Sequence, residues 1–402
     1  MPQEKLLHII GHLENELIAV RRHLHQFPEL SNQEVKTTAL LKQRLLDVGI
    51  RVLDVPLKTG LIAEVSGNPE GPVIAIRADI DALPIHEETD LPYISSKSEI
   101  MHACGHDFHT SVILGAAYLL KQQEHSLPGT VRIIFQPAEE TGHGAEEILG
   151  SGGLDGVQAI FGLHNTPYLK VGEFGTRVGP LTAAVDRFEV FVSGKGTHAA
   201  APDKGIDPIV ASSHLITALQ TIISRNTDPL DHALISITEL TSGNTWNVIP
   251  EKAYMQGTVR TLKDETRKAI PKKMKQVLEG VGNGLGVNIE FHWHPGPPAT
   301  NNDALWTPFV TDIANETGYE VKAIGPSLGG EDFAYYQETI PGTFVNIGTG
   351  KSYNHHHPKF TIDEEAIVPA AQFFSLLASK ALHQDQIFTS IKEKNNALLT
   401  QQ

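Results

Sequence analysis

Apolar and polar positions in the first part of the chain follow two alternating patterns. Residues 12–26 and 33–48 place apolar side chains three or four positions apart, which predicts two amphipathic helices. Two strands are predicted next, LIAEV (61–65) and VIAIRADI (73–80), and the second is a nearly continuous apolar run. Such runs are typical of strands that are buried on both faces of a helix-covered sheet.

The same alternation continues beyond these strands. A helix is predicted over SVILGAAYLLKQQ (111–123), and strands are predicted over VRIIFQ (131–136) and AIFGLH (159–164). Strands that alternate with helices predict an α/β sheet. Ligand sites of open α/β sheets lie at the carboxyl ends of the strands, so polar residues just after these strands are the first candidates for a site.

The pattern changes near Ala184. Six elements follow in the order strand, helix, strand, strand, helical region and strand, at 187–193, 207–226, 233–240, 252–262, 264–284 and 287–294. This order is typical of a ferredoxin-like β-α-β-β-α-β unit. After the loop HPGPPATNND (294–303), the first pattern resumes with a strand at 343–348 and a helix at about 364–383.

The chain is therefore predicted to hold two domains, which its 402 residues also favour. We expect a catalytic α/β domain with helices on both faces of a mixed sheet, formed by residues 1–183 and 297–402. A small α+β domain, residues 184–296, would interrupt it. The last dozen residues are polar and are expected to form a frayed tail.

Composition narrows the range of partners. The formal net charge of −15 argues against nucleic acid and anionic membranes, because both bind basic surfaces. No stretch approaches the roughly 18 apolar residues of a membrane span, and the N-terminus is a charged amphipathic helix. The single cysteine cannot form an internal disulfide, which agrees with a reducing compartment. We therefore expect a cytoplasmic protein that acts on a small molecule.

Side chains that could bind a metal ion occur in four separate clusters. They are the string from His102 to His109, which contains Cys104; the pair Glu139-Glu140; His164; and the triplet His355-His356-His357. Thiolate, imidazole and carboxylate are the groups that hold zinc-like divalent ions. The four clusters together suggest a metallohydrolase, and a two-metal hydrolase needs about five protein ligands, one of them bridging.

Each cluster also has a simpler interpretation. Cys104 could be a buried small side chain, but the histidines around it favour a ligand, and its sulfur could bridge two metals. Adjacent carboxylates in an extended segment face opposite ways, so one member of Glu139-Glu140 can bind a metal while the other moves protons. His164 could instead be a core histidine. The histidine triplet does not by itself show which member would bind.

Eight stretches, spread nearly end to end along the chain, match one family: RRHLHQFPELSNQE, IRADIDALP, MHACGHDFHT, FQPAEE, GKGTHAAAPDKGIDPI, WNVIPEKAYMQGTVRT, GGEDFAYY and HHPKFTIDEE. The chain resembles the amidohydrolase branch of the aminoacylase and carboxypeptidase metallopeptidases. This group contains hippurate hydrolase, N-acetyl-diaminopimelate deacetylase and the hydrolases of indoleacetyl-amino acids. The resemblance implies a zinc-peptidase-like catalytic domain with two metal ions, and an inserted ferredoxin-like lid domain that also forms a dimer.

The resemblance assigns roles to residues of these stretches. The metal ligands that it implies are Cys104, His106, Glu140, His164 and His356. The family pattern His-x-Pro-x-Phe selects His356 within the triplet. Glu139 would be the general base that moves a proton from water to the leaving amine. Asp79 would be a carboxylate that orients a ligating imidazole.

The resemblance also implies substrate-binding residues. His198 would stabilise the oxyanion, often from the neighbouring subunit, and Asn247 and Arg260 would hold the substrate carboxylate. Arg77 stands where related peptidases have a ligating histidine, and His106 would supply the replacement, because an arginine stays protonated and cannot ligate. This substitution fits the amidohydrolase branch rather than the dipeptidases.

We therefore expect a metal-dependent amidohydrolase that cleaves N-acetyl or aromatic acyl amino acids to a carboxylate and a free amino acid. Its cofactors would be two divalent ions, zinc or manganese, with cobalt or nickel accepted in vitro. The nearest alternative is a metal-dependent carboxypeptidase or dipeptidase. Two further alternatives are a hydrolase with Cys104 as nucleophile and His106 as base, and a metal-binding protein without catalysis. The expected assembly is a homodimer or a dimer of dimers through the lid domain, with neither nucleic acid nor membrane as partner.

Overall fold

The computed structural model describes residues 2–399, and the side chains as far as residue 393. By their internal contacts these residues form two compact units. Within the described range, unit 1 comprises Met1–Leu181, Asn301–Gly325 and Asp332–Gln402, and unit 2 comprises Thr182–Thr300 and Pro326–Glu331. The role of residues 184–296 as a lid and dimerisation domain stays a prediction.

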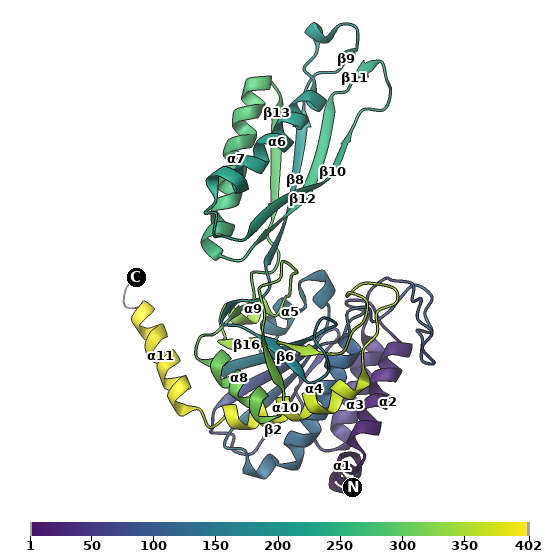
Figure 1. The fold of residues 1–402 in the computed structure, drawn as a ribbon, viewed down its shortest axis with the longest axis vertical. Coiled ribbons are helices and arrows are strands. Elements are labelled where there is room, and N and C mark those ends of the chain that lie inside the picture. The colour runs from purple at the N-terminus through teal and green to yellow at the C-terminus, as the bar shows by residue number, and fades with distance from the viewer. Residues whose placement is uncertain (1, 400–402) are drawn as a thin grey trace. The chain divides into compact units, whose positions relative to one another are not determined.

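Unit 1 is built on an eight-stranded mixed sheet (Figure 1). In sheet order the strands are β1 (Arg51–Val52), β2 (Leu61–Ser66), β4 (Thr130–Gln136), β3 (Val73–Asp79), β5 (Val157–Thr166), β16 (Gly342–Gly348), β6 (Glu173–Thr176) and β15 (Glu320–Ala323). The four central strands β4, β3, β5 and β16 are parallel to one another. Strands β2 and β6, which flank them, run antiparallel to them.

Helices cover both faces of this sheet, which confirms the predicted α/β class. Helices α4 (His106–Gln122) and α10 (Ile367–Ala381) pack on one face, and α5 (Gly144–Gly150) and α9 (Ala334–Gln337) pack on the other. The other helices of unit 1 are α1 (Pro2–Gly11), α2 (Leu13–Gln26), α3 (Val35–Asp47), α8 (Trp306–Glu316) and α11 (Asp385–Leu399), with the single 3-10 turns η1 (Glu124–Ser126), η2 (Glu139–Thr141) and η4 (Glu364–Ala366).

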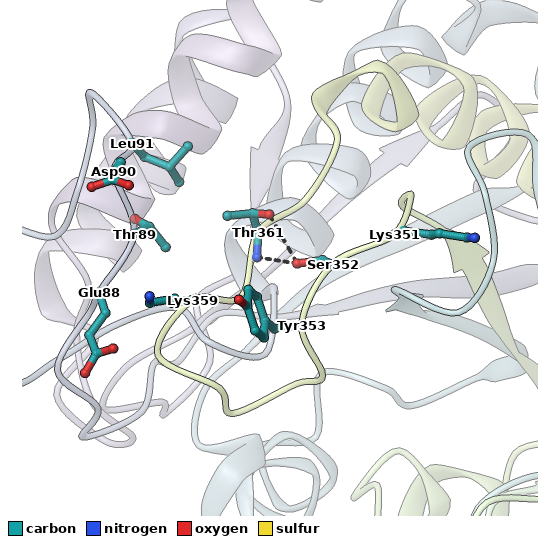
Figure 2. Close-up of a pocket in the computed structure, with 9 residues that line it drawn as sticks. All are labelled: Glu88, Thr89, Asp90, Leu91, Lys351, Ser352, Tyr353, Lys359 and Thr361. Carbon is teal, nitrogen blue, oxygen red and sulfur yellow. Dashed lines mark hydrogen bonds between the residues drawn. The ribbon is translucent and has the colours of Figure 1, made fainter.

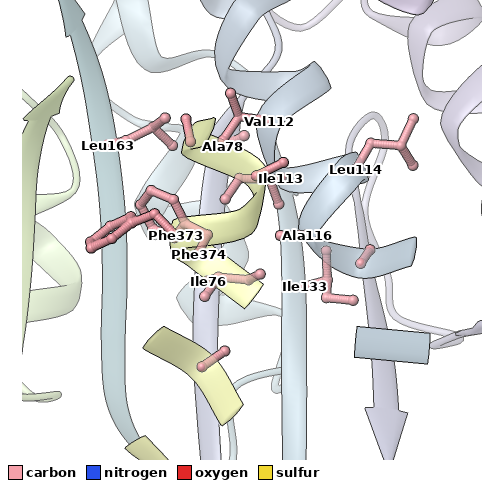
Figure 3. Close-up of a cluster of buried hydrophobic side chains, with 14 of the residues drawn as sticks. Ile76, Ala78, Val112, Ile113, Leu114, Ala116, Ile133, Leu163, Phe373 and Phe374 are labelled. Carbon is pink, nitrogen blue, oxygen red and sulfur yellow. The ribbon is translucent and has the colours of Figure 1, made fainter. Parts of the chain in front are cut away.

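The central strands bury side chains on both faces, as their continuous apolar runs predict. In β3, Ile74 and Ile76 point into the core under α4 and α10, whereas Ala75 points into the core under α5. Figure 3 shows the larger core, where Ile113 of α4 and Phe373 of α10 meet the sheet. Because apolar side chains pack against both faces, we expect the polar side chains of a site to lie at the ends of the strands.

The C-terminal segment differs from the predicted frayed tail. Helix α11 continues to Leu399. Its side chain Phe388 is buried and packs edge to face against Trp306, with ring centroids 5.3 Å apart. Phe388 precedes the predicted tail, so this contact anchors the first part of the helix, and residues 391–399 of the predicted tail continue it. The rest of the predicted tail, residues 400–402, lies outside the described residues. Among residues 2–399, no helix has both the length and the apolar character that a membrane span requires.

Unit 2 contains a four-stranded antiparallel sheet with two helices on one face. Its strands, in sheet order, are β10 (Ala233–Ser242), β12 (Lys252–Thr261), β8 (Ala184–Ser193) and β13 (Asn288–His294), and its helices are α6 (Pro208–Asn226) and α7 (Asp264–Leu285). A two-stranded ribbon of β9 (Thr197–His198) and β11 (Val248–Ile249) lies at one end of the sheet (Figure 1). The turn η3 (Pro202–Lys204) follows β9. The chain order of the four long strands and two helices is that of a ferredoxin-like unit.

The two ends of the long segment of unit 2 meet at one short ribbon of unit 1, and the chain enters unit 2 again only at Pro326–Glu331. Strand β7 (Gly179–Pro180) ends the first part of unit 1 and pairs antiparallel with β14 (Asn301–Asn302), which begins the next part. The buried Asn302 amide donates hydrogen bonds to the backbone carbonyls of Arg177 and Phe344, each within 3.1 Å. The ribbon therefore fixes where the two ends of the inserted segment meet.

A buried ion-pair network ties the N-terminal helix α2 to the C-terminal part of unit 1. Glu364, in η4, accepts hydrogen bonds from Arg21 (3.2 Å) and Arg22 (2.6 Å). Arg21 also donates to the hydroxyl of Tyr93 at 2.8 Å. Burial alone would raise the pKa of Glu364, but hydrogen bonds and charge from both arginines lower it below its ordinary value.

We predict that Glu364→Gln lowers the free energy of unfolding by about 1–3 kcal/mol at pH 7, because both arginines lose a charged acceptor. A lowered folded-state pKa stabilises the fold above the unfolded value of about 4.3, and this contribution is lost as pH falls through the folded pKa. In urea unfolding, the difference from the wild type should therefore be largest near pH 7 and should shrink as pH falls through the folded-state pKa of Glu364. Glu365→Gln, at the exposed neighbouring position, is the matched control.

Candidate metal centre

The predicted ligands lie at one edge of the unit 1 sheet. Cys104 directly precedes α4, Glu140 lies in η2 just after β4, and His164 lies in β5 near its carboxyl end. His356 follows β16 in a loop. Since β4, β3, β5 and β16 are parallel neighbours, their carboxyl ends meet at the same edge of the sheet. Four segments that are far apart in the chain thus meet at one point.

The five predicted ligands form overlapping groups of potential metal donors. Cys104 Sγ lies 3.5 Å from His164 Nε2, and Glu140 Oε1 lies 3.5 Å from His356 Nε2 and 3.8 Å from His106 Nε2. Within each of three groups, all ligand atoms lie within 4.8 Å of one another: Cys104, His106 and His164; Cys104, Glu140 and His356; His106, Glu139 and Glu140. The shared members Cys104, His106 and Glu140 join these groups into one cluster.

Two atoms of this cluster have the character of metal donors. His106 Nε2 and Glu140 Oε1 are buried and have no hydrogen-bond partner among the described residues. Leaving a buried polar atom unpaired costs about 1–3 kcal/mol, so native structures rarely do so without a reason. A mixed set of sulfur, nitrogen and oxygen donors suits zinc and similar divalent ions. The residues present therefore fit a divalent metal centre.

Within the histidine triplet, His356 is the member that reaches the cluster. Its φ of 65° turns the backbone, and its N–H donates to the carbonyl of Ala103 at 2.9 Å. His355 instead lies 3.1 Å from Asn165 Oδ1 through its Nε2, and His357 stacks on Tyr353. The family pattern and the geometry therefore select the same residue.

The imidazole that contacts Asp79 most closely is not that of a predicted metal ligand. Its carboxylate contacts His109 Nδ1 at 2.6 Å and Arg77 Nη1 at 2.6 Å, whereas His106 Nε2 is 3.7 Å away. The imidazole that Asp79 orients is thus His109, which is not among the predicted ligands. Burial alone would raise the pKa of Asp79, but the charges of His106, His109 and Arg77 hold it well below its ordinary value. The carboxylate is therefore ionised.

Arg77 occupies a buried position beneath the cluster, and its contacts are those of an ion-pair partner. It donates to Gln136 Oε1 (2.8 Å) and Asp332 Oδ1 (2.8 Å) besides Asp79. Burial raises the pKa of Asp332 to about 6, although the charge of Arg77 acts in the opposite direction. The positive charge of the guanidinium therefore offsets the negative charge of the carboxylates around it. Because the residue here is arginine, this position supplies no histidine ligand.

Two residues that contact the cluster were not among the predicted site residues. Asp81 hydrogen-bonds to His106, and the side-chain amide of Asn165 donates to the backbone carbonyl of Cys104 at 2.5 Å. The signal for Asp81 was its place in RADIDALP, a stretch in which only the first aspartate was assigned a role. Asn165 directly follows the candidate ligand His164.

The environment of Cys104 bears on the alternative in which it is a nucleophile. Burial raises the pKa of the Cys104 thiol well above its ordinary value, and the negative charge of Glu140 adds to this effect. A nucleophilic cysteine needs a lowered pKa, supplied by nearby positive charge or a helix N-terminus. The arrangement therefore favours a metal ligand, because a bound cation deprotonates a coordinating thiol.

The predicted substrate-binding residues lie in unit 2, at two different ends of its sheet. His198 and Asn247 lie together, since Val248 pairs with His198 and the Ala199 N–H donates to the Asn247 carbonyl at 3.0 Å. Arg260 lies at the other end of β12, opposite Val185. The eight residue-to-residue steps from 252 to 260 span about 26 Å of strand. Asn247 and Arg260 of one chain therefore cannot contact the same small carboxylate.

A cavity of about 580 Å³ lies beside the loop that carries His356 (Figure 2). One wall is the segment 88–91, and the other consists of residues of the segment 351–361. The Glu88 N–H donates to the Pro358 carbonyl at 2.9 Å, which joins the two walls. The Thr361 N–H donates to Ser352 Oγ at 2.8 Å and closes the loop on itself. The cavity and the candidate ligand therefore share one supported loop.

Comparison with known proteins agrees with this geometry. The profile of Peptidase family M20/M25/M40 matches residues 75–380. The chain belongs to this family. An N-acetyl-L-cysteine deacetylase of Bacillus subtilis is 50% identical over 374 residues, covering 93% of this chain and 90% of that protein. Thermostable carboxypeptidase 1 of Saccharolobus solfataricus is 37% identical over 386 residues, covering 94% of this chain and 98% of that protein.

A solved structure supports the fold assignment. The crystal structure of a dinuclear metal binding peptidase of the M20 family from Bacillus subtilis has a TM-score of 0.85 and 49% sequence identity, and the match covers 93% of this chain and 99% of that one. The fold class and the membership of a metal-dependent hydrolase family are thus confirmed. The roles of individual site residues stay predictions.

We predict that Gly105→Ala disrupts the cluster. Gly105 has a φ of +91° between Cys104 and His106, and an added Cβ would lie 2.3 Å from Asn165 Nδ2. Strain and collision should lower the free energy of unfolding by about 2 kcal/mol or more and reduce the bound metal below that of the wild type. Thermal unfolding and elemental analysis measure the two effects.

Gly280→Ala is the matched control. Gly280 lies inside helix α7, and an added Cβ would have nothing within 4 Å. Alanine should stabilise the helix by up to about 1 kcal/mol and leave metal content unchanged. Equal metal loss in both variants would contradict the role assigned to the Gly105 turn.

Proposed function

We propose that this chain hydrolyses the amide bond of N-acyl amino acids, with N-acetyl or aromatic acyl groups, and releases a carboxylate and a free amino acid. The observation that carries this proposal is the convergence of five potential metal donors at the carboxyl edge of the sheet, with Glu139 beside two of them, His106 and Glu140. The 50% identity to an N-acetyl-L-cysteine deacetylase supports the substrate class. Assay of N-acylated amino acids with metal-loaded protein tests it directly.

Cys104, His106, Glu140, His164 and His356 would hold two divalent ions. Such ions polarise a scissile carbonyl and lower the pKa of water so that it becomes a nucleophile near neutral pH. Zinc suits the thiolate and imidazole donors, and manganese suits the carboxylate. We propose zinc or manganese as the native ion, with cobalt or nickel accepted in vitro.

Glu139 is proposed as the general base and acid. Its Oε2 lies 4.0 Å from His106 Nε2, and its side chain is 12% exposed, so it borders the cluster and remains reachable by solvent. Its neighbour Glu140 faces His356 and is the candidate ligand of the pair. Glu139 would accept a proton from the attacking water and deliver it to the leaving nitrogen. Near this site, the positive charge of Arg77 would offset the negative charge of Asp79.

A dimer is proposed to complete the substrate site. His198 and Asn247 lie at one end of the unit 2 sheet and Arg260 at the other, so a single chain does not bring them together. We propose that His198 and Asn247 act on the active site of the partner subunit, where His198 would bind the oxyanion. Arg260 would bind the substrate carboxylate. A homodimer or a dimer of dimers would meet this requirement.

Peptide cleavage is the second candidate function, because a thermostable carboxypeptidase is 37% identical to the chain. N-benzoyl amino acids and dipeptides separate the two, since only the former lack a free amino group. The cytoplasmic location expected from the sequence stays a prediction, which fractionation of cells expressing the chain would test.

We predict that exhaustive chelation abolishes hydrolysis and that Mn²⁺ or Zn²⁺ restores it. A hydrolase with Cys104 as nucleophile would keep its activity after chelation, because its thiolate and imidazole need no ion. The measurement is the initial rate on N-acetyl amino acids before chelation, after it, and after adding back each metal. Persistent activity in verified metal-free protein would contradict the proposal.

Glu139→Gln should reduce kcat by about 10²–10⁴-fold, because the amide cannot accept the proton. Metal content should stay equal to that of the wild type, because the five proposed ligands are unchanged. Near-normal turnover with both ions bound would remove Glu139 from the mechanism. Glu146→Gln in α5, which is exposed, is the control and should keep full activity.

Mixing two inactive variants tests the proposed dimer. His198→Ala and Glu139→Gln each inactivate every site of their own homodimer. If His198 acts on the partner subunit, random mixed dimers contain one intact site, and activity should recover to about a quarter of the wild-type value. The measurement is the rate after co-refolding or subunit exchange. Recovery of no activity in verified mixed dimers would place His198 at its own subunit's site.

A further inference from the structure

Asp81 contacts two of the candidate metal ligands at once. It lies two residues beyond β3, and only 1% of its surface is exposed. Its Oδ1 and its backbone carbonyl oxygen lie 3.2 and 2.9 Å from His106 Nδ1. Its Oδ2 accepts a hydrogen bond from the backbone N–H of Glu140 at 3.0 Å. His106 begins α4 and Glu140 lies in η2, so one buried carboxylate joins two separate segments.

These contacts decide which nitrogen of His106 carries the proton. A backbone carbonyl can only accept a hydrogen bond, so Nδ1 carries a proton and donates it to Asp81. Nε2 is therefore the nitrogen left to bind a metal, and it is buried without a hydrogen-bond partner in the described part of the chain. A histidine that binds a metal through Nε2 needs this tautomer.

Side chains of the motif FPELSNQE (27–34) also form hydrogen bonds to Asp81 and to the backbone next to Glu139. Ser31 Oγ donates to Asp81 Oδ2 at 2.7 Å. Glu34, which is fully buried, accepts a hydrogen bond from the backbone N–H of Ala138 at 2.9 Å. Ala138 has a φ of 55° and immediately precedes Glu139. The motif therefore supports the backbone on which the carboxylate pair is placed, although the proposed reaction uses none of its side chains.

We infer that Asp81 is a positioning residue that holds His106 and Glu140 in the arrangement of two metal donors, and that Ser31 and Glu34 support it. The inference rests on the proposed function, because it presumes a metal centre formed by these ligands. Removing the partners of metal ligands typically reduces metal affinity by about 10–100-fold. The role of Asp81 is therefore measurable as metal affinity, apart from catalysis.

Asp81→Asn tests the inference. An amide offers one accepting oxygen and one donating NH₂, so it cannot accept from His106 Nδ1 and from Glu140 and Ser31 at the same time. In equilibrium dialysis against Co²⁺, we expect the dissociation constant of at least one ion to rise about 10–100-fold. The visible absorption of bound Co²⁺, which reports ligand geometry, should also change. Saturating metal should restore part of the turnover.

Asp186→Asn is the matched control. Asp186 is a fully buried carboxylate of unit 2 that pairs with Arg267 at 2.8 Å. Its substitution should lower thermal stability and leave Co²⁺ affinity and spectrum as in the wild type. An Asp81→Asn protein with wild-type affinity and an unchanged Co²⁺ spectrum would overturn the inference.

Ser31→Ala provides a second test should Asp81→Asn fail to fold. It removes one donor to the Asp81 carboxylate, and the Co²⁺ dissociation constant should rise about fivefold, the equivalent of one hydrogen bond. An unchanged constant would again overturn the inference. Failure of the proposed function looks different: the wild-type protein itself would bind no pair of ions.

Discussion

The site depends on buried donor atoms that the fold leaves unpaired. His106 Nε2 and Glu140 Oε1 are shielded from water and have no hydrogen-bond partner among the described residues. Each such atom costs about 1–3 kcal/mol, so the apolar packing of the domain must offset this cost. Divalent cations bound at this cluster would remove that cost. The same feature that makes the region unfavourable for folding thus makes it favourable for metal binding.

The sheet explains why these donors meet. The central strands bury apolar side chains on both faces, as Ile76 and Ala75 of β3 do on opposite sides. Polar side chains can then leave the core only at the strand ends, where four parallel strands share one edge. Further buried carboxylates position the backbone there: Asp81 holds the Glu140 N–H, and Glu34 holds the Ala138 N–H. The site is therefore supported by several segments of unit 1.

Sequence reasoning located the ligands better than their partners. Cys104 and Glu140 stood out because each lies in a stretch that matches the family, and the structure places both in the cluster. The partner of Asp79 could not be foreseen, since four histidines follow it within thirty residues and only packing selects His109. Composition likewise did not show that helix α11 continues to Leu399.

The chain by itself determined the family, the alternation of strands and helices, and the set of metal-binding side chains, because motif identity and periodicity are local properties. The family pattern already selected His356 within the triplet, and its Nε2 lies in the cluster. Only the tertiary structure decided that Asp79 contacts His109 and that His198 and Arg260 lie at opposite ends of one sheet. Both outcomes depend on packing or on strand register. These are set by contacts between distant segments, which no local pattern records.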